Sequence, residues 1–238
     1  MGLPEFREGD DIGRLIADAA APGEGEIVVF SQKAVSKAEG RVRRLADVRP
    51  GERARELAAR LEKDPAVVEL VLSEAKRIVR AERGVLITET RSGWVCANSG
   101  IDTSNLEHGS VTLLPENGDS SARRIRASIA EACGASPAVV IADSFGRAWR
   151  LGQVDVAIGC AGLAPLDDWR GRRDAHGGEL SATVISVADE AAAAADLSRD
   201  KDSGVPGAVI MGLDHLVTPE DGPGARSVQR PEAEDLFR

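Results

Sequence analysis

Apolar, mostly β-branched residues gather in short runs separated by glycine, proline and charged residues. Such runs predict β-strands, because branched side chains pack well on a pleated surface and turn-forming residues bound a strand. Two runs, at residues 85–89 and 94–97, flank Arg91-Ser92-Gly93 and predict a hairpin. The other predicted strands lie at residues 26–30, 111–115, 138–142, 156–160, 183–188 and 207–211.

Other segments repeat apolar residues every three or four positions, which predicts amphipathic helices. Asp10 or Asp11 is the predicted N-cap of a helix over residues 12–19. Asp64-Pro65 opens another, which we expect to continue through Val79 and to end at Gly84. Further predicted helices cover residues 54–61, 120–133 and 189–197. Helices mixed with hairpins favour an α+β or mixed α/β fold over a regular doubly wound sheet.

Charged and hydroxyl side chains lie between the two apolar runs of residues 138–163. The first run ends on Asp143-Ser144, so we expect a carboxylate and a hydroxyl to leave the sheet together, with a turn at Gly146. These oxygens suit a divalent ion, and the nearby Arg147 and Arg150 suit a metal-bound phosphate. A polar turn with solvated arginines has the same composition, so this segment alone leaves both interpretations open.

A second acid, Asp102, lies in a stretch of small polar residues at positions 98–105. We expect Asp102 to share an ion with Asp143, each at the end of its own strand. The alternative is that Asp102 only caps its own loop, as Asp and Asn residues often do.

Residues 31–41 are rich in hydroxyl groups and lysines, and we expect them to form a turn without the glycine spacing of a Walker phosphate loop. Lysines there can hold phosphates as point charges, or the stretch can be a solvated loop. The stretch at residues 164–179 is rich in glycine and charged residues, which predicts a long surface loop that is able to cover a ligand.

The overall charge narrows the range of partners. Thirty basic and 39 acidic residues give a formal net charge of −9 without a long basic block, which argues against nucleic acid and anionic membranes. The cysteines show no metal-type spacing, and His176 and His215 lack a paired ligand pattern, so no zinc site is expected. Cys96, Cys133 and Cys160 are expected to be buried free thiols. Without a signal core or a long apolar run, the protein is expected to be soluble and cytoplasmic.

Five segments together resemble one enzyme family, the coenzyme F420:L-glutamate ligases, which are γ-glutamyl ligases of a deazaflavin coenzyme. These segments are SQKAVSKAEGR, CANSGIDTSN, LLPENGDSSARRIR, IADSFGRAWRLGQVDVAIGCAGLAPLDDWRG and RPEAEDLFR, in this order. The resemblance covers essentially the whole chain, so residues 1–238 are expected to form a single ligase unit with room for two subdomains. Some bacterial members carry a C-terminal flavin reductase-like domain, which we do not expect here.

The resemblance implies a two-domain fold of largely antiparallel sheets with flanking helices, and an entwined homodimer. It implies that GTP and divalent Mg or Mn, as two ions, support the addition of L-glutamate to the F420 precursor; a monovalent cation such as K is a further expected cofactor. Asp102 and Asp143 would hold one metal, and Ser144 a second, where the family usually has threonine. Asp102, Asp143 and Lys37 are the expected catalytic residues. The residues expected to contact the nucleotide are Leu3, Pro4, Glu5, Phe6, Gln32, Lys37, Asn105, Arg199, Asp200 and Lys201.

The segment at residues 199–206 departs from the family pattern M-G-x-A-D-G-I-P at Arg199, Asp200 and Ser203. Lys201 stands where a side-chain oxygen reaches the second metal, and an ammonium group cannot be a ligand.

The residues agree with the implied chemistry. Joining a carboxylate to an amine in water requires an activated carboxylate, and phosphoryl transfer to it is mainly electrostatic and positional catalysis. No Ser-His-Asp or Cys-His arrangement suggests a covalent site. The alternatives are a metal-dependent phosphohydrolase, a non-catalytic nucleotide-binding protein and a structural dimerisation protein.

Overall fold

The computed structural model describes residues 3–104 and 106–236, and it is built on a four-stranded sheet. The strands are β1 (Ile27–Ser31), β7 (Ala138–Arg147), β8 (Arg150–Ala161) and β11 (Gly207–Ile210), in the order β11-β1-β7-β8. Only β1 and β7 pair in parallel, and the other neighbours are antiparallel. Residues of both parities in β1 and at the start of β7 are buried, so both faces of this sheet are covered.

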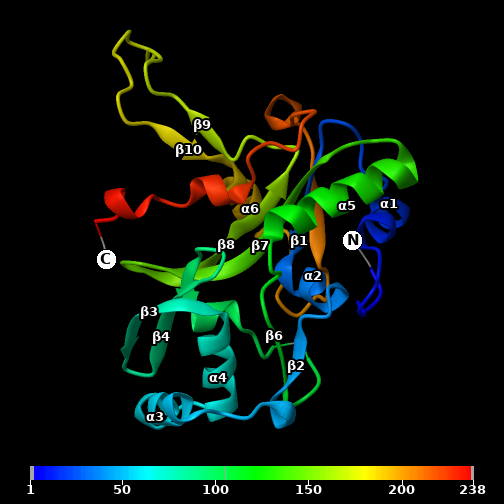
Figure 1. The fold of residues 1–238 in the computed structure, drawn as a ribbon. Helices are drawn as coiled ribbons and strands as arrows, with labels where there is room; N and C mark the ends of the chain where they lie inside the picture. Colours follow the sequence, from blue (N-terminus) through cyan, green and yellow to red (C-terminus); the bar gives the residue numbers. More distant parts are fainter. Residues whose placement is uncertain (1–2, 105, 237–238) are drawn as a thin grey trace.

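Three helices provide that cover. The long helix α5 (Gly118–Cys133) and its neighbour α1 (Ile12–Ala20) lie on one face, and α6 (Val187–Asp196) lies on the other (Figure 1). Asp11 caps α1 by accepting from the backbone N–H of Arg14, as its position before the apolar stripe predicts. Asn117 caps α5 in the same way, so this helix begins slightly earlier than expected.

A second hydrophobic cluster lies below the main sheet. Its buried residues come from α3 (Glu52–Leu61), α4 (Pro65–Glu74) and β4 (Val85–Thr90), whereas the larger cluster surrounds the main sheet (Figure 1). β4 is the middle strand of an antiparallel sheet with β3 (Ala75–Glu82) and β5 (Val95–Ala97), which confirms the predicted hairpin. The fold is therefore mixed α+β with mostly antiparallel pairing. The division into two domains stays a prediction.

Smaller elements complete the chain. Helix α2 (Gln32–Ala38) follows β1 directly, and β2 (Val42–Arg44) pairs with β6 (Ser110–Thr112). The pair β9 (Leu166–Asp168) and β10 (Val184–Ser186) forms the base of an arm that projects from the body (Figure 1). The predicted surface loop thus forms part of this arm.

Several predictions about local structure are wrong. Residues 31–41 are mostly the helix α2 rather than a turn, because Ala34 and Val35 pack into the core. The helix that opens at Pro65 ends at Glu74, and the next eight residues pair with β4 as β3. Cys133 is exposed, whereas Cys96 and Cys160 are buried; all three thiols are free.

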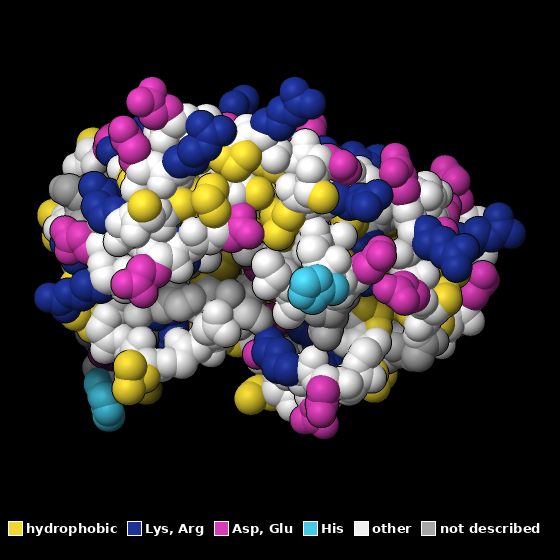
Figure 2. All heavy atoms as spheres, turned by 90° about the horizontal axis from the view of Figure 1, so that it is seen from below, with side chains coloured by type: hydrophobic (Ala, Val, Ile, Leu, Met, Phe, Trp, Pro, Cys, Tyr) yellow, Lys and Arg dark blue, Asp and Glu magenta, His cyan; other side chains and the backbone are white. Residues whose placement is uncertain are grey.

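Two findings concern membrane-spanning helices and the distribution of surface charge. In the described part of the chain, no helix is both long and apolar enough to cross a membrane. Acidic and basic side chains are interspersed over the face seen in Figure 2, without a continuous basic area on that face.

Candidate active site

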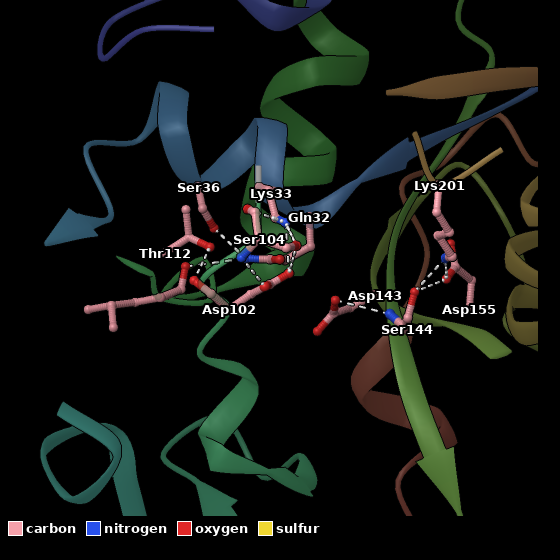
Figure 3. Close-up of polar contacts among 11 residues, drawn as sticks. Gln32, Lys33, Ser36, Asp102, Ser104, Thr112, Asp143, Ser144, Asp155 and Lys201 are labelled. Atoms are coloured by element: carbon pink, nitrogen blue, oxygen red, sulfur yellow. Dashed lines mark hydrogen bonds and ion pairs between the residues drawn. The ribbon is translucent and has the colours of Figure 1, made fainter. Parts of the chain in front are cut away.

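Asp143 and Ser144 are consecutive residues in the middle of β7, so their side chains point to opposite sides of the strand. Figure 3 shows Asp143 turned toward Asp102, and Ser144 turned toward Asp155 and Lys201. The prediction that the strand ends here is wrong, because β7 continues to Arg147 and its hairpin with β8 turns at Trp149, whose φ is 58°. Gly146 lies within β7 and is not the turn. The predicted site is thus divided by the strand into two halves.

The first half brings Asp102 beside a lysine of α2. Asp102 pairs through its backbone with Thr112, and its Oδ2 lies 2.8 Å from Lys33 Nζ. Its Oδ1 accepts from the backbone N–H of Ser104 at 2.7 Å, so Asp102 does cap its own loop as well. Burial alone would raise the pKa of Asp102, but the hydrogen bond and charge of Lys33, with the Ser104 N–H, lower it below its usual value. Asp102 is therefore a carboxylate that remains ionised.

Asp143 completes this half and lacks such compensation. Burial and the negative charges of Asp102 and Asp155 raise the pKa of Asp143 to about 7, although the backbone N–H of Ser144 opposes them. Among the described residues, that N–H, 3.0 Å from Oδ1, is the one hydrogen-bond donor to Asp143. Two neighbouring carboxylates, of which one is paired with Lys33, present a local excess of negative charge. A bound cation would relieve this excess.

The second half is a network around Asp155, the residue directly opposite Ser144 in the β7–β8 ladder. Ser144 Oγ donates to Asp155 Oδ1 at 2.5 Å, and Arg199 holds Oδ2 at 3.0 Å. Lys201 Nζ lies 2.8 Å from Ser144 Oγ and 2.9 Å from Asp196 Oδ1. The carboxylates in this half already have cationic partners.

The two halves differ in how they fit a metal ion. In residues 3–104 and 106–236, no group of three or more His, Cys, Asp or Glu side chains could hold a metal alone. Mg²⁺ is commonly bound by one or two carboxylates, with water and substrate phosphates completing the octahedron. The Asp102–Asp143 half fits that pattern. The Ser144 half holds the ammonium of Lys201 at the oxygen that would be the ligand.

The expected nucleotide residues fall into two groups. The N-terminal segment meets α2, because Glu5 Oε1 lies 3.1 Å from Lys37 Nζ while Phe6 packs edge-on against Phe30 in the core. Leu3 is half-buried and Pro4 is exposed beside them. This group brings together residues that lie more than 30 positions apart in the chain.

Gln32 and the segment at residues 199–201 have mixed roles. The side-chain amide of Gln32 is buried and donates to Ser36 Oγ and to the carbonyl of Leu113, so it braces the core. Arg199 is also internal, whereas Asp200 and Lys201 are exposed. Asn105 lies outside the described residues.

Comparison with known proteins places these residues in a family. The family model described as F420-0:gamma-glutamyl ligase matches residues 1–212 of the 238-residue chain. The chain belongs to this family.

Several relatives within the F420-0:gamma-glutamyl ligase family align over nearly their whole length. The coenzyme F420:L-glutamate ligase of Methanothermobacter thermautotrophicus is 42% identical over 243 residues, covering 100% of this chain and 96% of the relative. The protein of the same name from Methanopyrus kandleri is 43% identical, covering 98% of this chain and 94% of the relative. That from Archaeoglobus fulgidus is 41% identical, with coverage of 100% and 94%.

Sequence reasoning did not single out Lys33, Asp155 or Asp196 as members of the site, although Lys33 lies in the lysine-rich stretch of residues 31–41. Lys33 lies one helical turn before Lys37, so recognising α2 would have placed both lysines on one face. Asp155 follows from the register of the β7–β8 hairpin, which sets it opposite Ser144. No sequence signal links Asp196 to Ser144, because they lie in different elements and meet only through Lys201.

Proposed function

We propose that this protein is a GTP-dependent ligase that joins L-glutamate to the precursor of the deazaflavin coenzyme F420. The observation that carries the proposal is the match over essentially the whole chain to relatives named coenzyme F420:L-glutamate ligase, at 41–43% identity. The Asp102–Asp143 pair, with Lys33 of α2 at Asp102, supports phosphoryl chemistry at this place.

The proposed reaction has two steps that balance. A carboxylate oxygen of the precursor attacks the γ-phosphorus of GTP, and the bond to the bridging oxygen breaks to release GDP. The amine of glutamate then attacks the resulting acyl phosphate, loses a proton and expels phosphate as the amide forms. Both steps depend on neutralising phosphate charge and holding the reactants in line.

Residues of the chain divide these tasks. Asp102 and Asp143 would hold a divalent Mg or Mn ion, which when bound neutralises phosphate oxygens. Lys37 supplies a point charge to the nucleotide phosphates, and Lys33 orients Asp102 through its 2.8 Å ion pair. The segment Leu3, Pro4, Glu5 and Phe6 lines the nucleotide next to Lys37. We also propose that the 25.0 kDa chain forms a homodimer, which sedimentation would reveal as a species of twice that mass.

The test is a product analysis with an intermediate trap. Precursor, GTP, Mn²⁺ and glutamate should yield the glutamylated product by mass spectrometry, with one GDP and one phosphate for each new amide. Without glutamate, hydroxylamine should intercept the acyl phosphate as a hydroxamate. Asp143→Asn should abolish both products, and the matched change at an exposed carboxylate, Asp47→Asn, should leave them intact.

Other outcomes would assign other functions. Phosphate release without amide would indicate a phosphohydrolase, and nucleotide binding without phosphate release would indicate a binding protein. Ligation with GMP and pyrophosphate as products would contradict the acyl phosphate.

A further inference from the structure

The ammonium group of Lys201 contacts oxygens of three side chains, and Figure 3 shows two of them, Ser144 and Asp155. A lysine ammonium has three N–H donors and no acceptor. Here it has three acceptors, Ser144 Oγ at 2.8 Å, Asp196 Oδ1 at 2.9 Å and Asp155 Oδ1 at 3.4 Å. The hydrogen-bonding capacity of the group is therefore matched within this cluster.

These oxygens come from three separate elements. Ser144 is in β7, Asp155 is opposite it in β8, and Asp196 ends α6. Asp155 is held in place by Arg199 at 3.0 Å, with both side chains less than a tenth exposed. Ser144 and Asp155 are thus held in place by contacts other than those with Lys201.

A divalent ion at Ser144 Oγ would lie only a few ångströms from the Lys201 ammonium. Two positive groups so close would repel each other. The ammonium would have to leave its three acceptors before such an ion could bind.

We propose that the Lys201 ammonium takes the place of a second metal ion, so that each chain binds one divalent ion, at Asp102 and Asp143. The inference deepens the proposed function, because the ammonium then supplies to the nucleotide the positive charge that a second ion would otherwise supply. The number of bound ions is a property of the site and can be measured without ligase turnover.

The experiment counts Mn²⁺ per chain in the presence of GDP, by equilibrium dialysis with elemental analysis and by EPR of the free ion. Wild-type protein should bind one ion. Lys201→Gln removes the charge and supplies an amide oxygen, and it should bind two. Adding Ser144→Ala to Lys201→Gln should return the count to one, because the cluster loses its hydroxyl ligand.

Two control variants test whether the number of bound ions depends on the positive charge at residue 201 in particular. Lys201→Arg keeps the positive charge and should still bind one ion. Lys33→Gln removes one charge from the other half of the site and should also bind one. Lys201 is exposed on its loop, so these variants should fold, which thermal unfolding would check.

A wild-type count other than one, or a count of one for Lys201→Gln, would overturn the inference. Failure of the proposed function is a separate result. A protein that follows the predicted ion counts but forms no amide would refute the ligase assignment and leave the role of Lys201 intact.

Discussion

Ser144 and Asp155 face each other across the β7–β8 ladder, with Ser144 Oγ 2.5 Å from Asp155 Oδ1. The pair lies on one side of strand β7, where cationic side chains balance the carboxylates. The other side of the strand has a different electrostatic environment. Asp143, one residue away, lies in the environment with excess negative charge, and its pKa is raised by burial and by Asp102 and Asp155. The site is therefore asymmetric before any ligand is bound.

Replacing Asp143 tests the proposed metal site. Asp143→Asn keeps the shape but removes the charge that holds the cation, so activity should fall by several orders of magnitude. The metal-free protein should unfold at the same or a higher temperature, because a poorly compensated carboxylate is gone. Mn²⁺ titration and thermal unfolding would measure both effects. Unchanged Mn²⁺ affinity in this variant would show that Asp143 is not a ligand.

Ser144 should tolerate one substitution and not another. Ser144→Thr retains the hydroxyl and suits a strand, so activity should stay within a few-fold of wild type. Ser144→Ala removes the 2.5 Å donor to Asp155 Oδ1 and one of the three acceptors of the Lys201 ammonium. The loss of a buried hydrogen-bond partner should lower the unfolding free energy by about 1–3 kcal/mol and reduce activity. Equal activity and stability in all three proteins would exclude a role for the hydroxyl.

The contact between Gly118 and Gly159 should not accept a side chain. A Cβ on Gly159 would lie 2.2 Å from the carbonyl carbon of Gly118, so α5 and β8 would have to separate. Gly159→Ala should therefore destabilise the protein by about 1–3 kcal/mol or more. Urea unfolding would measure this loss. The control is Gly146→Ala in β7, where a Cβ meets no atom within 4 Å; equal effects at the two positions would contradict the steric explanation.

Glu89 should make stability depend on pH in the acid range. Hydrogen bonds from Lys76 and Arg77 lower the pKa of Glu89 to about 2, so its stabilising contribution is present above the unfolded-state pKa of about 4.5 and is lost as the pH falls toward 2. Because both partners are solvent-exposed, we expect about 1–2 kcal/mol at pH 7.

The measurement compares urea unfolding of wild type and Glu89→Gln. The advantage of wild type should be present at pH 7 and should shrink as the pH falls from about 4.5 toward 2. Other carboxylates titrate in both proteins and cancel in the difference. A difference that stays constant with pH would show that the ion pairs of Glu89 do not stabilise the fold.

Much of this protein can be predicted from sequence because the signals are local. The N-cap Asp11, the stripe of residues 54–61 and the hairpin around Gly93 each depend on residues a few positions apart, and the structure has all three. The family, too, is evident from segments read in order along the chain, and the comparison confirms it.

Where local signals favour two different secondary structures, contacts in the tertiary structure decided which one forms. Ile78 and Val79 extend the helical stripe of α4, but branched residues also suit a strand, and pairing with β4 satisfies the backbone of β3. In the same way, the buried Ala34 and Val35 favour α2, although Ser31, Ser36 and the lysines suggest a turn.

The arrangement of the site also lies beyond the sequence. Asp143 and Ser144 are adjacent in the chain, yet the alternation of a β-strand sends one to Asp102 and the other to Asp155. Four further residues contact this site from other places in the chain, namely Lys33, Asp155, Asp196 and Lys201. Sequence determines the family and the chemical groups that this protein can use. Only the packing of the sheet and its helices determines which charges meet, because electrostatic interactions depend on distance in space and on burial.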